Sequence, residues 1–291
     1  MHSIRIIPRL DIKGPNLVKG IHLEGLRVLG KPEQFAKYYY ESGADELIYM
    51  DVVASLYGRN SLLGIVEKTA KEIFIPLTVG GGIRSLSDIR DVLRAGADKV
   101  ALNTAAIGNP QIVSEASQMF GSSTIVISIE AIKQPDGQYL AFTDNGREHT
   151  GLDVVEWARR AAELGAGEIM LTSVDREGTG QGYDVELCRK VADAVPIPVI
   201  VCGGAGNFEH IHRVIVDGNA DAVSLASVLH YDVIKNQVFR EDDFKVEGNL
   251  EYMKSGRSFS KINSGNLFEI KSYLTERGIL CRTITEQETH A

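Results

Sequence analysis

The sequence predicts an α/β protein, a (β/α)8 TIM barrel built from two homologous half-barrels. The apolar run and glycines of residues 75–82 recur at 197–204, and the Gly-Ala pair of 43–44 recurs at 165–166. A repeat of buried strand, Gly-rich loop and helix indicates two fused half-barrels. Short β-rich runs alternate with helical patterns throughout, which is typical of βαβ units in a parallel sheet. The length of 291 residues is usual for one such barrel.

The composition narrows the class of protein. A formal net charge of -8 disfavours non-specific nucleic-acid binding. No apolar stretch is long enough to span a membrane, and the first nine residues lack the apolar region of a signal peptide, so we expect a cytoplasmic protein. The three cysteines are far apart and odd in number, which fits reduced thiols and no metal site; no cofactor is expected.

The eight strands are expected where short apolar runs recur. Helices are expected between them, for example over 31–42, 85–95 and 153–164, with Ser85 and Asp153 as N-caps and Gly43, Gly96 and Gly165 as stops. The expected strands are 4–10, 46–51, 75–79, 99–102, 124–130, 168–172, 199–202 and 222–225.

Two segments depart from this alternation. Residues 134–137, Gln-Pro-Asp-Gly, lie between two extended stretches and predict a hairpin turn after the fifth strand. Residues 235–266 are polar and lack periodicity, so they predict an insertion before a last helix over 267–277. The insertion is too short and polar for its own core, and we expect one domain over residues 1–291.

Two carboxylates are expected at the mouth of the barrel. Asp11 ends the first strand and Glu130 ends the fifth, at equivalent positions of the two halves. Active sites of such barrels form at the C-terminal ends of the strands, and two facing carboxylates are a natural general acid and base. The alternative is that each carboxylate only caps a loop or pairs with a nearby lysine.

The Gly-rich loops predict two anion sites. Gly82 and Gly204 lie in loops that follow an apolar strand and precede a helix, where free backbone N–H groups can face an anion. The next strand ends, Asn103-Thr104 and Ala226-Ser227, would complete each cradle. The alternative is two tight turns without a ligand. Two such loops in register favour a ligand with two phosphates.

Four charged residues start strands and should therefore meet at the bottom of the barrel. They are two cations, Arg5 and Lys99, and two anions, Glu46 and Glu168. Buried ion pairs are costly unless fully paired, and they often mark specificity or switching. The alternative is a structural plug.

Together these motifs resemble HisF, the cyclase subunit of imidazole glycerol phosphate synthase. The resemblance covers nearly the whole chain except the insertion and the residues after 282. It rests on motifs that include Arg5-Ile6-Ile7-Pro8, Leu10-Asp11, Val18-Lys19-Gly20, Gly43-Ala44-Asp45-Glu46-Leu47, residues 76–84, Ala95-Gly96-Ala97-Asp98-Lys99-Val100, Gly165-Ala166-Gly167-Glu168-Ile169, Gly178-Thr179, Gly182-Tyr183-Asp184 and Gly203-Gly204-Ala205-Gly206-Asn207.

This resemblance implies a reaction and a partner. A HisH-like glutaminase subunit would dock at the barrel bottom and supply ammonia through a gate formed by the four charged residues. At the top, a bis-phosphorylated ribulosyl aminoimidazole carboxamide would be converted to imidazole glycerol phosphate and aminoimidazole carboxamide ribotide.

The resemblance also implies roles for individual residues. Asp11 is carried over as a catalytic carboxylate, and Lys19 lies on a mobile first loop over the substrate. The residues carried over as phosphate ligands are Gly82, Asn103 and Thr104 for one phosphate, and Gly178, Gly204, Ala226 and Ser227 for the other.

Two residues depart from the family pattern. Glu130 stands where the family has Asp, so its carboxyl lies one methylene further out, and about 1 Å of misplacement can cost on the order of a hundredfold in rate. Arg9 stands where the family usually has Cys. Strand alternation aims Arg9 into the lumen, where a guanidinium needs a carboxylate partner. Glu130 is the first candidate partner and Asp11 the second.

Three functions are therefore open. The first is the ammonia-dependent cyclase, a lyase, which the retained Asp11 favours. The second is a HisF-like paralogue that delivers ammonia to another acceptor, such as a sugar in surface polysaccharide synthesis. If Arg9 pairs with Glu130, that carboxyl is a poor general acid and the ammonia path is partly filled. Activity of the wild type with saturating ammonium would separate the first two functions. The third is a scaffold that binds a phosphosugar without turnover.

Overall fold

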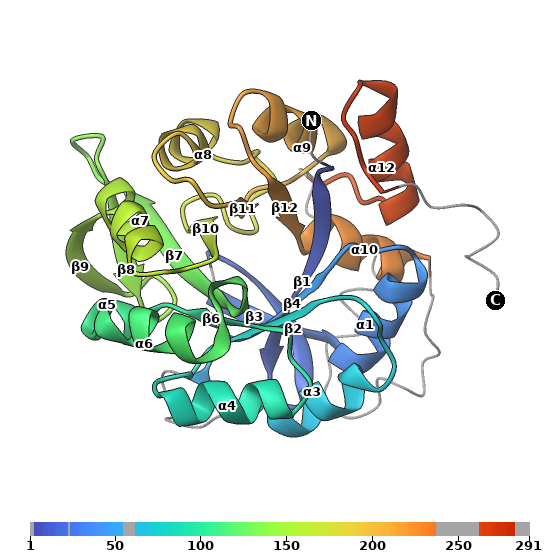
Figure 1. Ribbon diagram of the computed structural model, residues 1–291. Helices are drawn as coiled ribbons and strands as arrows, with labels where there is room; N and C mark the ends of the chain where they lie inside the picture. The colour runs from blue at the N-terminus through green and yellow to red at the C-terminus, as the bar shows by residue number, and fades with distance from the viewer. Residues whose placement is uncertain (1–2, 23, 55–61, 237–261, 283–291) are drawn as a thin grey trace.

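The computed structural model describes residues 3–22, 24–54, 62–236 and 262–282, and these form a closed parallel barrel (Figure 1). Each strand of the barrel pairs in parallel with the next, and the last pairs with the first. The order is β1 (Arg5–Lys13), β4 (Leu47–Asp51), β5 (Leu77–Gly80), β6 (Lys99–Leu102), β7 (Ile125–Lys133), β10 (Glu168–Ser173), β11 (Val199–Cys202) and β12 (Ala222–Leu225). The predicted fold and all eight predicted strands are confirmed.

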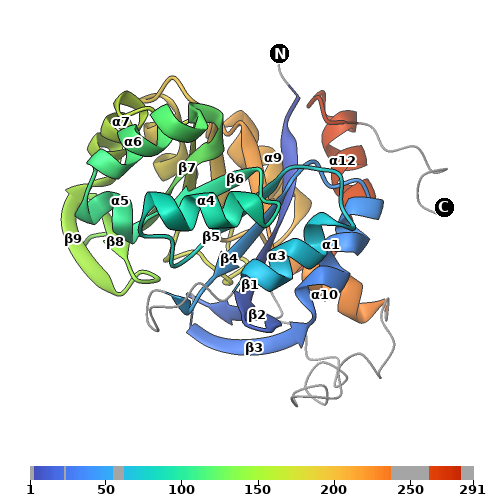
Figure 2. The same cartoon turned by 60° about the horizontal axis from the view of Figure 1, so that its bottom comes forward.

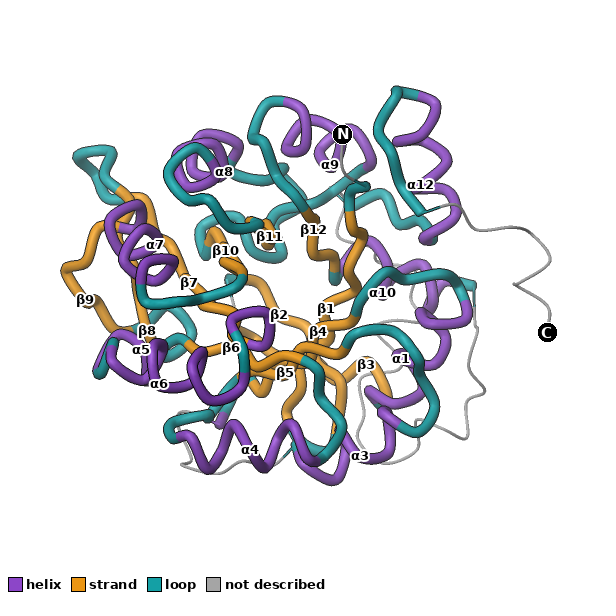
Figure 3. The backbone as a smooth tube through the Cα atoms, viewed as in Figure 1, coloured by secondary structure: helices purple, strands orange, loops and turns teal. Residues whose placement is uncertain are grey.

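Helices surround the strand ring on the outside, as Figure 3 shows. Their apolar faces and the outer faces of the strands form one large buried core. The helices are α1 (Pro32–Glu41), α3 (Leu63–Ala70), α4 (Leu86–Arg94), α5 (Thr104–Gly108), α6 (Gln111–Phe120), α7 (Val154–Glu163), α8 (Val185–Ala192), α9 (Phe208–Val216), α10 (Ser227–Lys235) and α12 (Leu267–Glu276).

The predicted helix boundaries follow from capping chemistry. The Ser85 hydroxyl accepts from the N–H of Asp88 in a capping box, and the Asp153 carboxylate accepts from two N–H groups at the start of α7. Gly43, Gly96 and Gly165 follow their helices with positive φ angles, as a glycine stop requires. The last helix, α12, begins after Asn266 as predicted. Residues 237–261 of the expected insertion lie outside the described residues.

The first and fifth strands run past the barrel into antiparallel ribbons, so Asp11 and Glu130 lie within strands and not at their ends. β1 continues to Lys13 because β2 (Asn16–Ile21) pairs with it, and β3 (Glu24–Gly30) pairs with β2. β7 continues to Lys133 because the predicted hairpin turn joins it to β8 (Tyr139–Thr143), which pairs with β9 (Glu148–Asp153). Figure 2 places the β2–β3 ribbon at the end of the barrel opposite the N-terminus.

Three aspartates before strands β4, β6 and β12 bind backbone N–H groups at the bottom of the barrel. The side chains of Asp45, Asp98 and Asp221 accept from the backbone N–H groups of Ile6, Leu77 and Val199 at 2.8, 2.9 and 2.9 Å. Each aspartate thereby satisfies an N–H at the start of a neighbouring strand. The aspartates of the Ala-Asp pairs at 44–45, 97–98 and 220–221 therefore each satisfy a backbone donor at the lower edge of the barrel.

The two halves repeat in local geometry at the Gly-rich loops. A Cβ on Gly81 would lie 2.3 Å from the carbonyl oxygen of Asp51, and one on Gly203 would lie 2.7 Å from that of Ser173. Both glycines have φ angles near +90°. Asn103 and Ala226 share an unusual backbone conformation, with φ/ψ of -128/-87° and -123/-78°. The sequence repeat of the Gly-rich loops and the following strand ends is therefore matched by a repeat of their backbone conformation.

The close approach at Gly81 makes a stability prediction. Gly81→Ala puts a Cβ against a backbone oxygen at a φ of 94°, which we expect to destabilise the fold by about 1–3 kcal/mol or more. Gly64→Ala in α3 is the matched control, because its Cβ meets nothing within 4 Å and alanine favours a helix by up to about 1 kcal/mol. Urea unfolding of both variants measures the difference, and equal effects would contradict this account.

Candidate active site

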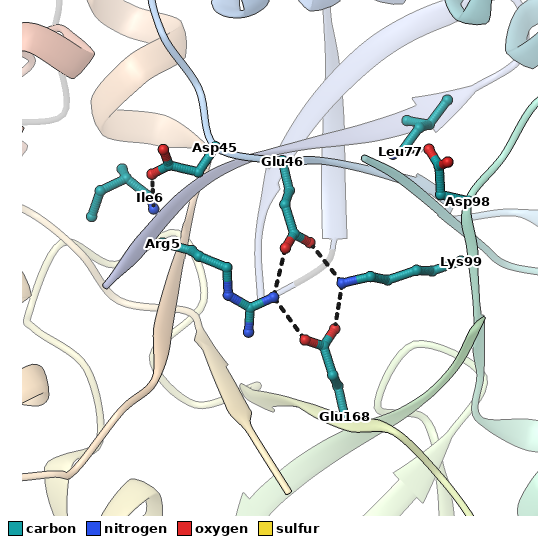
Figure 4. Close-up of polar contacts among 8 residues, drawn as sticks. All are labelled: Arg5, Ile6, Asp45, Glu46, Leu77, Asp98, Lys99 and Glu168. Atoms are coloured by element: carbon teal, nitrogen blue, oxygen red, sulfur yellow. Dashed lines mark hydrogen bonds and ion pairs between the residues drawn. The ribbon is translucent and has the colours of Figure 1, made fainter. Parts of the chain in front are cut away.

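The four predicted charges form a closed ring at the bottom of the barrel (Figure 4). Arg5 Nη1 donates to Glu46 Oε1 at 2.6 Å and to Glu168 Oε1 at 2.7 Å. Lys99 Nζ donates to the other oxygens of the same carboxylates, at 3.0 and 2.9 Å. Burial alone would lower the pKa of Arg5, but the two carboxylates raise it. The expected set of ion pairs is confirmed, and its role as an ammonia gate stays a prediction.

Above the ring, the lumen is mainly apolar. The inward residues of the strands form a second buried cluster, separate from the core under the helices. Its members are Ile7, Val18, Ile48, Met50, Val52, Ala101, Val126, Met170, Ile200, Cys202 and Ala222. Charges that lie higher in the lumen must therefore find partners among themselves.

Arg9 points into the lumen and pairs with Asp11. Its Nε donates to Asp11 Oδ1 at 2.8 Å, and its Nη1 donates to the Thr172 hydroxyl on β10 at 3.2 Å. Both charged side chains are buried. The inward orientation predicted for Arg9 is confirmed. The preferred partner, Glu130, was wrong: Asp11 lies two residues along the same strand on the same face, within direct reach of the guanidinium.

Glu130 has a different environment from Asp11. Its Oε2 accepts from the backbone N–H of Gly146 at 2.8 Å, in the turn between β8 and β9. Burial raises the pKa of Glu130 to about 7, although the Gly146 N–H and the charge of Arg9 act to lower it. A poor general acid was expected only if Arg9 paired directly with Glu130, and the structure does not meet this condition.

Lys19 lies in β2 and forms a buried ion pair with Glu177, in the loop after β10. Burial alone would lower the pKa of Lys19, but the charges of Glu177 and Asp11 and the hydrogen bond to Glu177 together raise it. Burial alone would raise the pKa of Glu177, but the charges of Lys19 and Arg9 and the hydrogen bond from Lys19 together lower it. The His22 N–H also donates to the Glu177 carbonyl at 2.9 Å. These two contacts hold the first loop, which includes β2, against the loop after β10 at the mouth of the barrel.

The predicted phosphate residues divide into two groups at the C-terminal face. Gly82 follows β5, and Asn103 and Thr104 lie where β6 meets α5; the Asn103 amide donates to the Phe142 carbonyl at 3.2 Å. Gly204 follows β11 and its carbonyl accepts from Gly182, while Ala226 and Ser227 lie at the start of α10. Neither α5 nor α10 has a side-chain cap at its N-terminus.

Gly178, which was predicted to bind the second phosphate, lies in close backbone contact with β2. A Cβ on Gly178 would lie 2.6 Å from the carbonyl oxygen of Gly20 in β2. The loop after β10 therefore lies directly on the ribbon that carries Lys19. This contact brings Gly178 to the barrel mouth.

Sequence reasoning missed three polar contributors. Thr172 is an inward residue of β10, so strand alternation could have indicated it. Glu177 lies in the loop after β10, directly before the Gly178-Thr179 motif that the resemblance rests on. His230 in α10 is fully buried, with Nε2 3.0 Å from the Arg9 carbonyl and Nδ1 2.6 Å from the Tyr39 hydroxyl. Burial lowers the pKa of His230 to about 3, so the ring is neutral. Its apolar helical surroundings gave no signal of this contact.

Comparison with known proteins gives the family. The model of the histidine biosynthesis protein family matches residues 5–235. The imidazole glycerol phosphate synthase subunit HisF of Legionella pneumophila is 59% identical over 212 residues, which is 73% of this chain and 100% of that protein. The chain belongs to the histidine biosynthesis protein family. It is HisF-like, and like that homologue it is an enzyme of the lyase class.

The described residues were also compared with the requirements of a metal site and of a membrane span, and they meet neither. Among the described residues, no group of three or more His, Cys, Asp or Glu side chains is arranged to hold a metal ion. In the same part of the chain, no helix combines the length and apolar character that a membrane crossing needs. A cavity of about 610 Å³ lies beside α8, lined by residues that include Lys133, Arg176 and Glu186, and it contains none of the predicted site residues.

The raised pKa of Glu130 predicts a pH dependence of stability. Between pH 4.5 and about 7 the folded protein keeps this proton and the unfolded chain loses it, so stability falls as pH rises through that window. Glu130→Gln should match the wild type near pH 4. Near pH 8 we expect it to be more stable by roughly 3 kcal/mol, since the pKa differs by about 2.5 units between the folded and unfolded states and one unit corresponds to about 1.4 kcal/mol.

Urea unfolding at several pH values measures this effect. The control is Glu163→Gln, an exposed glutamate of α7, which should leave the pH dependence unchanged. A constant difference between Glu130→Gln and the wild type across the whole range would contradict the raised pKa.

Proposed function

We propose that this chain is an ammonia-dependent cyclase. It converts a bis-phosphorylated ribulosyl aminoimidazole carboxamide to imidazole glycerol phosphate and aminoimidazole carboxamide ribotide, with ammonia from a HisH-like glutaminase subunit, and we expect it to act in the cytoplasm. The observation that carries the proposal is the pair of buried carboxyl groups in unlike environments, Asp11 and Glu130, between two similarly built Gly-rich loops.

The unlike environments fit the two proton transfers that cleavage and ring closure need. Glu130, with a pKa raised to about 7 by burial, can donate a proton and take one back near neutral pH. Asp11 is held against a guanidinium and carries negative charge at the mouth. It can stabilise the positive charge that develops on the substrate when ammonia adds. One carboxyl then acts as the acid, and the other as the electrostatic and basic partner.

The two loop groups fit a ligand with a phosphate at each end. Gly82 with Asn103 and Thr104 would hold one phosphate, and Gly178, Gly204, Ala226 and Ser227 the other. Their backbone N–H groups, at uncapped helix starts, are donors that suit phosphate oxygens. Lys19, paired to Glu177 in this structure, would contribute its charge when the first loop engages the substrate.

The bottom face fits a protein partner. Most of the large, exposed apolar side chains among the described residues lie where helices end and strands begin: Phe74 is 80% exposed, Met119 51%, Val216 49% and Leu280 52%. They lie on the same face as the charged ring. Exposed apolar side chains on the face that carries the charged ring fit a surface on which a subunit that delivers ammonia would dock.

The deciding experiment needs no partner. The purified chain is incubated with the bis-phosphate substrate and an ammonium salt, and both products are measured. We expect turnover in the wild type and its loss in Asp11→Asn. A wild type that binds the substrate without forming either product would contradict the cyclase.

One observation favours the second candidate, a paralogue that passes ammonia to another acceptor such as a sugar. The Arg9 guanidinium crosses the lumen between the charged ring and the mouth, on the path that ammonia would take. Product formation with saturating ammonium would exclude this candidate. If only glutamine hydrolysis in a partner were stimulated, the acceptor should be sought among sugars.

The first phosphate group makes a prediction. Thr104→Glu replaces a hydroxyl donor with a negative charge at the start of α5, so we expect the KM for the bis-phosphate substrate to rise at least about tenfold through charge repulsion. Thr104→Ser keeps the hydroxyl and serves as the control. Substrate titration measures both variants, and unchanged affinity in Thr104→Glu would remove this residue from the site.

The charged ring makes another prediction. Lys99→Ala breaks two of the four ion pairs, and we expect it to reduce glutamine-driven turnover in the complex more than ammonium-driven turnover of the chain alone. Lys37→Ala, which breaks an exposed ion pair with Glu72, is the control. Both turnover rates are measured for each variant, and equal losses in the two assays would indicate a structural plug.

A further inference from the structure

We propose that Arg9 is a positioning residue, which holds the Asp11 carboxylate in one orientation at the barrel mouth by spanning the lumen from β1 to β10. The kinetic part of this inference rests on the proposed function. Its structural part does not, because the orientation of Asp11 is measurable in the free protein.

The geometry of the guanidinium supports this role. Arg9 and Asp11 lie on the inner face of one strand, and Thr172 lies on β10, which is separated from β1 by β11 and β12. The Nε contact of 2.8 Å and the Nη1 contact of 3.2 Å therefore fix the planar group at two separate points. A guanidinium held on both sides presents Nε to Asp11 in one direction only.

The backbone of Arg9 is held as well. A carbonyl oxygen can only accept, so His230 Nε2 carries the proton and donates to the Arg9 carbonyl at 3.0 Å. Its Nδ1 then accepts from the Tyr39 hydroxyl at 2.6 Å. This chain of contacts joins α1, α10 and β1 in a fully buried setting. Both ends of the arginine are thus anchored to the scaffold.

Arg9 also neutralises part of the negative charge of the carboxyl groups around it. Asp11 and Glu177 both lie close enough for their charges to act on Arg9, and Glu130 is influenced by it in turn. The other nearby cation, Lys19, is hydrogen-bonded to Glu177. Without Arg9, the buried carboxylates of Asp11 and Glu177 would share one lysine. Asp11 would then be drawn toward Lys19, away from its present direction.

The kinetic experiment uses ammonium as the nitrogen source and three variants at this position. For Arg9→Met, which keeps most of the volume without the charge, we expect kcat to fall on the order of a hundredfold with little change in KM, since about 1 Å of misplacement can have that effect. Arg9→Lys should retain part of the activity. Added guanidinium, well below denaturing concentrations, should restore part of the activity of Arg9→Ala.

Arg189→Met, an exposed arginine of α8, is the matched control and should behave as the wild type. An unchanged kcat in Arg9→Met would overturn the proposal. Failure of guanidinium to raise the activity of Arg9→Ala, in protein that unfolds cooperatively, would overturn it as well.

The second measurement needs no substrate. In protein labelled selectively at aspartate, side-chain couplings of Asp11 should report one rotamer in the wild type and averaging in Arg9→Met. A wild type without cyclase activity, but with this change in couplings, would refute the proposed function and leave the positioning role intact. A single unchanged Asp11 rotamer in Arg9→Met would refute the positioning role itself.

Discussion

The lumen of this barrel must neutralise the charges that strand alternation directs into it. β1 alone places Arg5, Arg9 and Asp11 on its inner face, where water cannot solvate them fully. A buried charge without a partner costs several kcal/mol, so each one selects an opposite charge within reach. Arg5 finds Glu46 and Glu168, and Arg9 finds Asp11. The ring below and the carboxylates above are two solutions of this one constraint.

Much of the fold could be read from the sequence because parallel barrel strands are buried on both faces. Their near-continuous apolar runs, bounded by Gly and Pro, are distinctive. The charged ring could be read as well, because its four members each start a strand. The antiparallel strands that extend the barrel were harder to predict. The residues of β9 are exposed or only partly buried, so no apolar alternation marks the strand, and β2 and β3 gave no recognised strand signal either.

The pairing of Arg9 was predicted only in part, for a geometric reason. The sequence placed Arg9 inside the barrel, but it could not give the distance across the lumen to Glu130. Asp11 is two residues away on the same face, a spacing that any strand supplies. Glu130 has instead a donor from Gly146, in a turn with three consecutive positive φ angles whose path no sequence pattern fixed. A backbone donor that lies far away in the sequence can be identified only once the conformation of its loop is known.

The two halves share a backbone but not a charge pattern, and this difference bears on the chemistry. Asp11 and Glu130 occupy equivalent positions, and the residue equivalent to Arg9 in the second half is Ser128, also buried. One carboxylate therefore pairs with a guanidinium, and the other accepts from the backbone N–H of Gly146. Identical halves would give the two carboxyls identical surroundings. The arginine of the first half and the Gly146 turn of the second give them unlike neighbours, as a reaction that needs both an acid and a base requires.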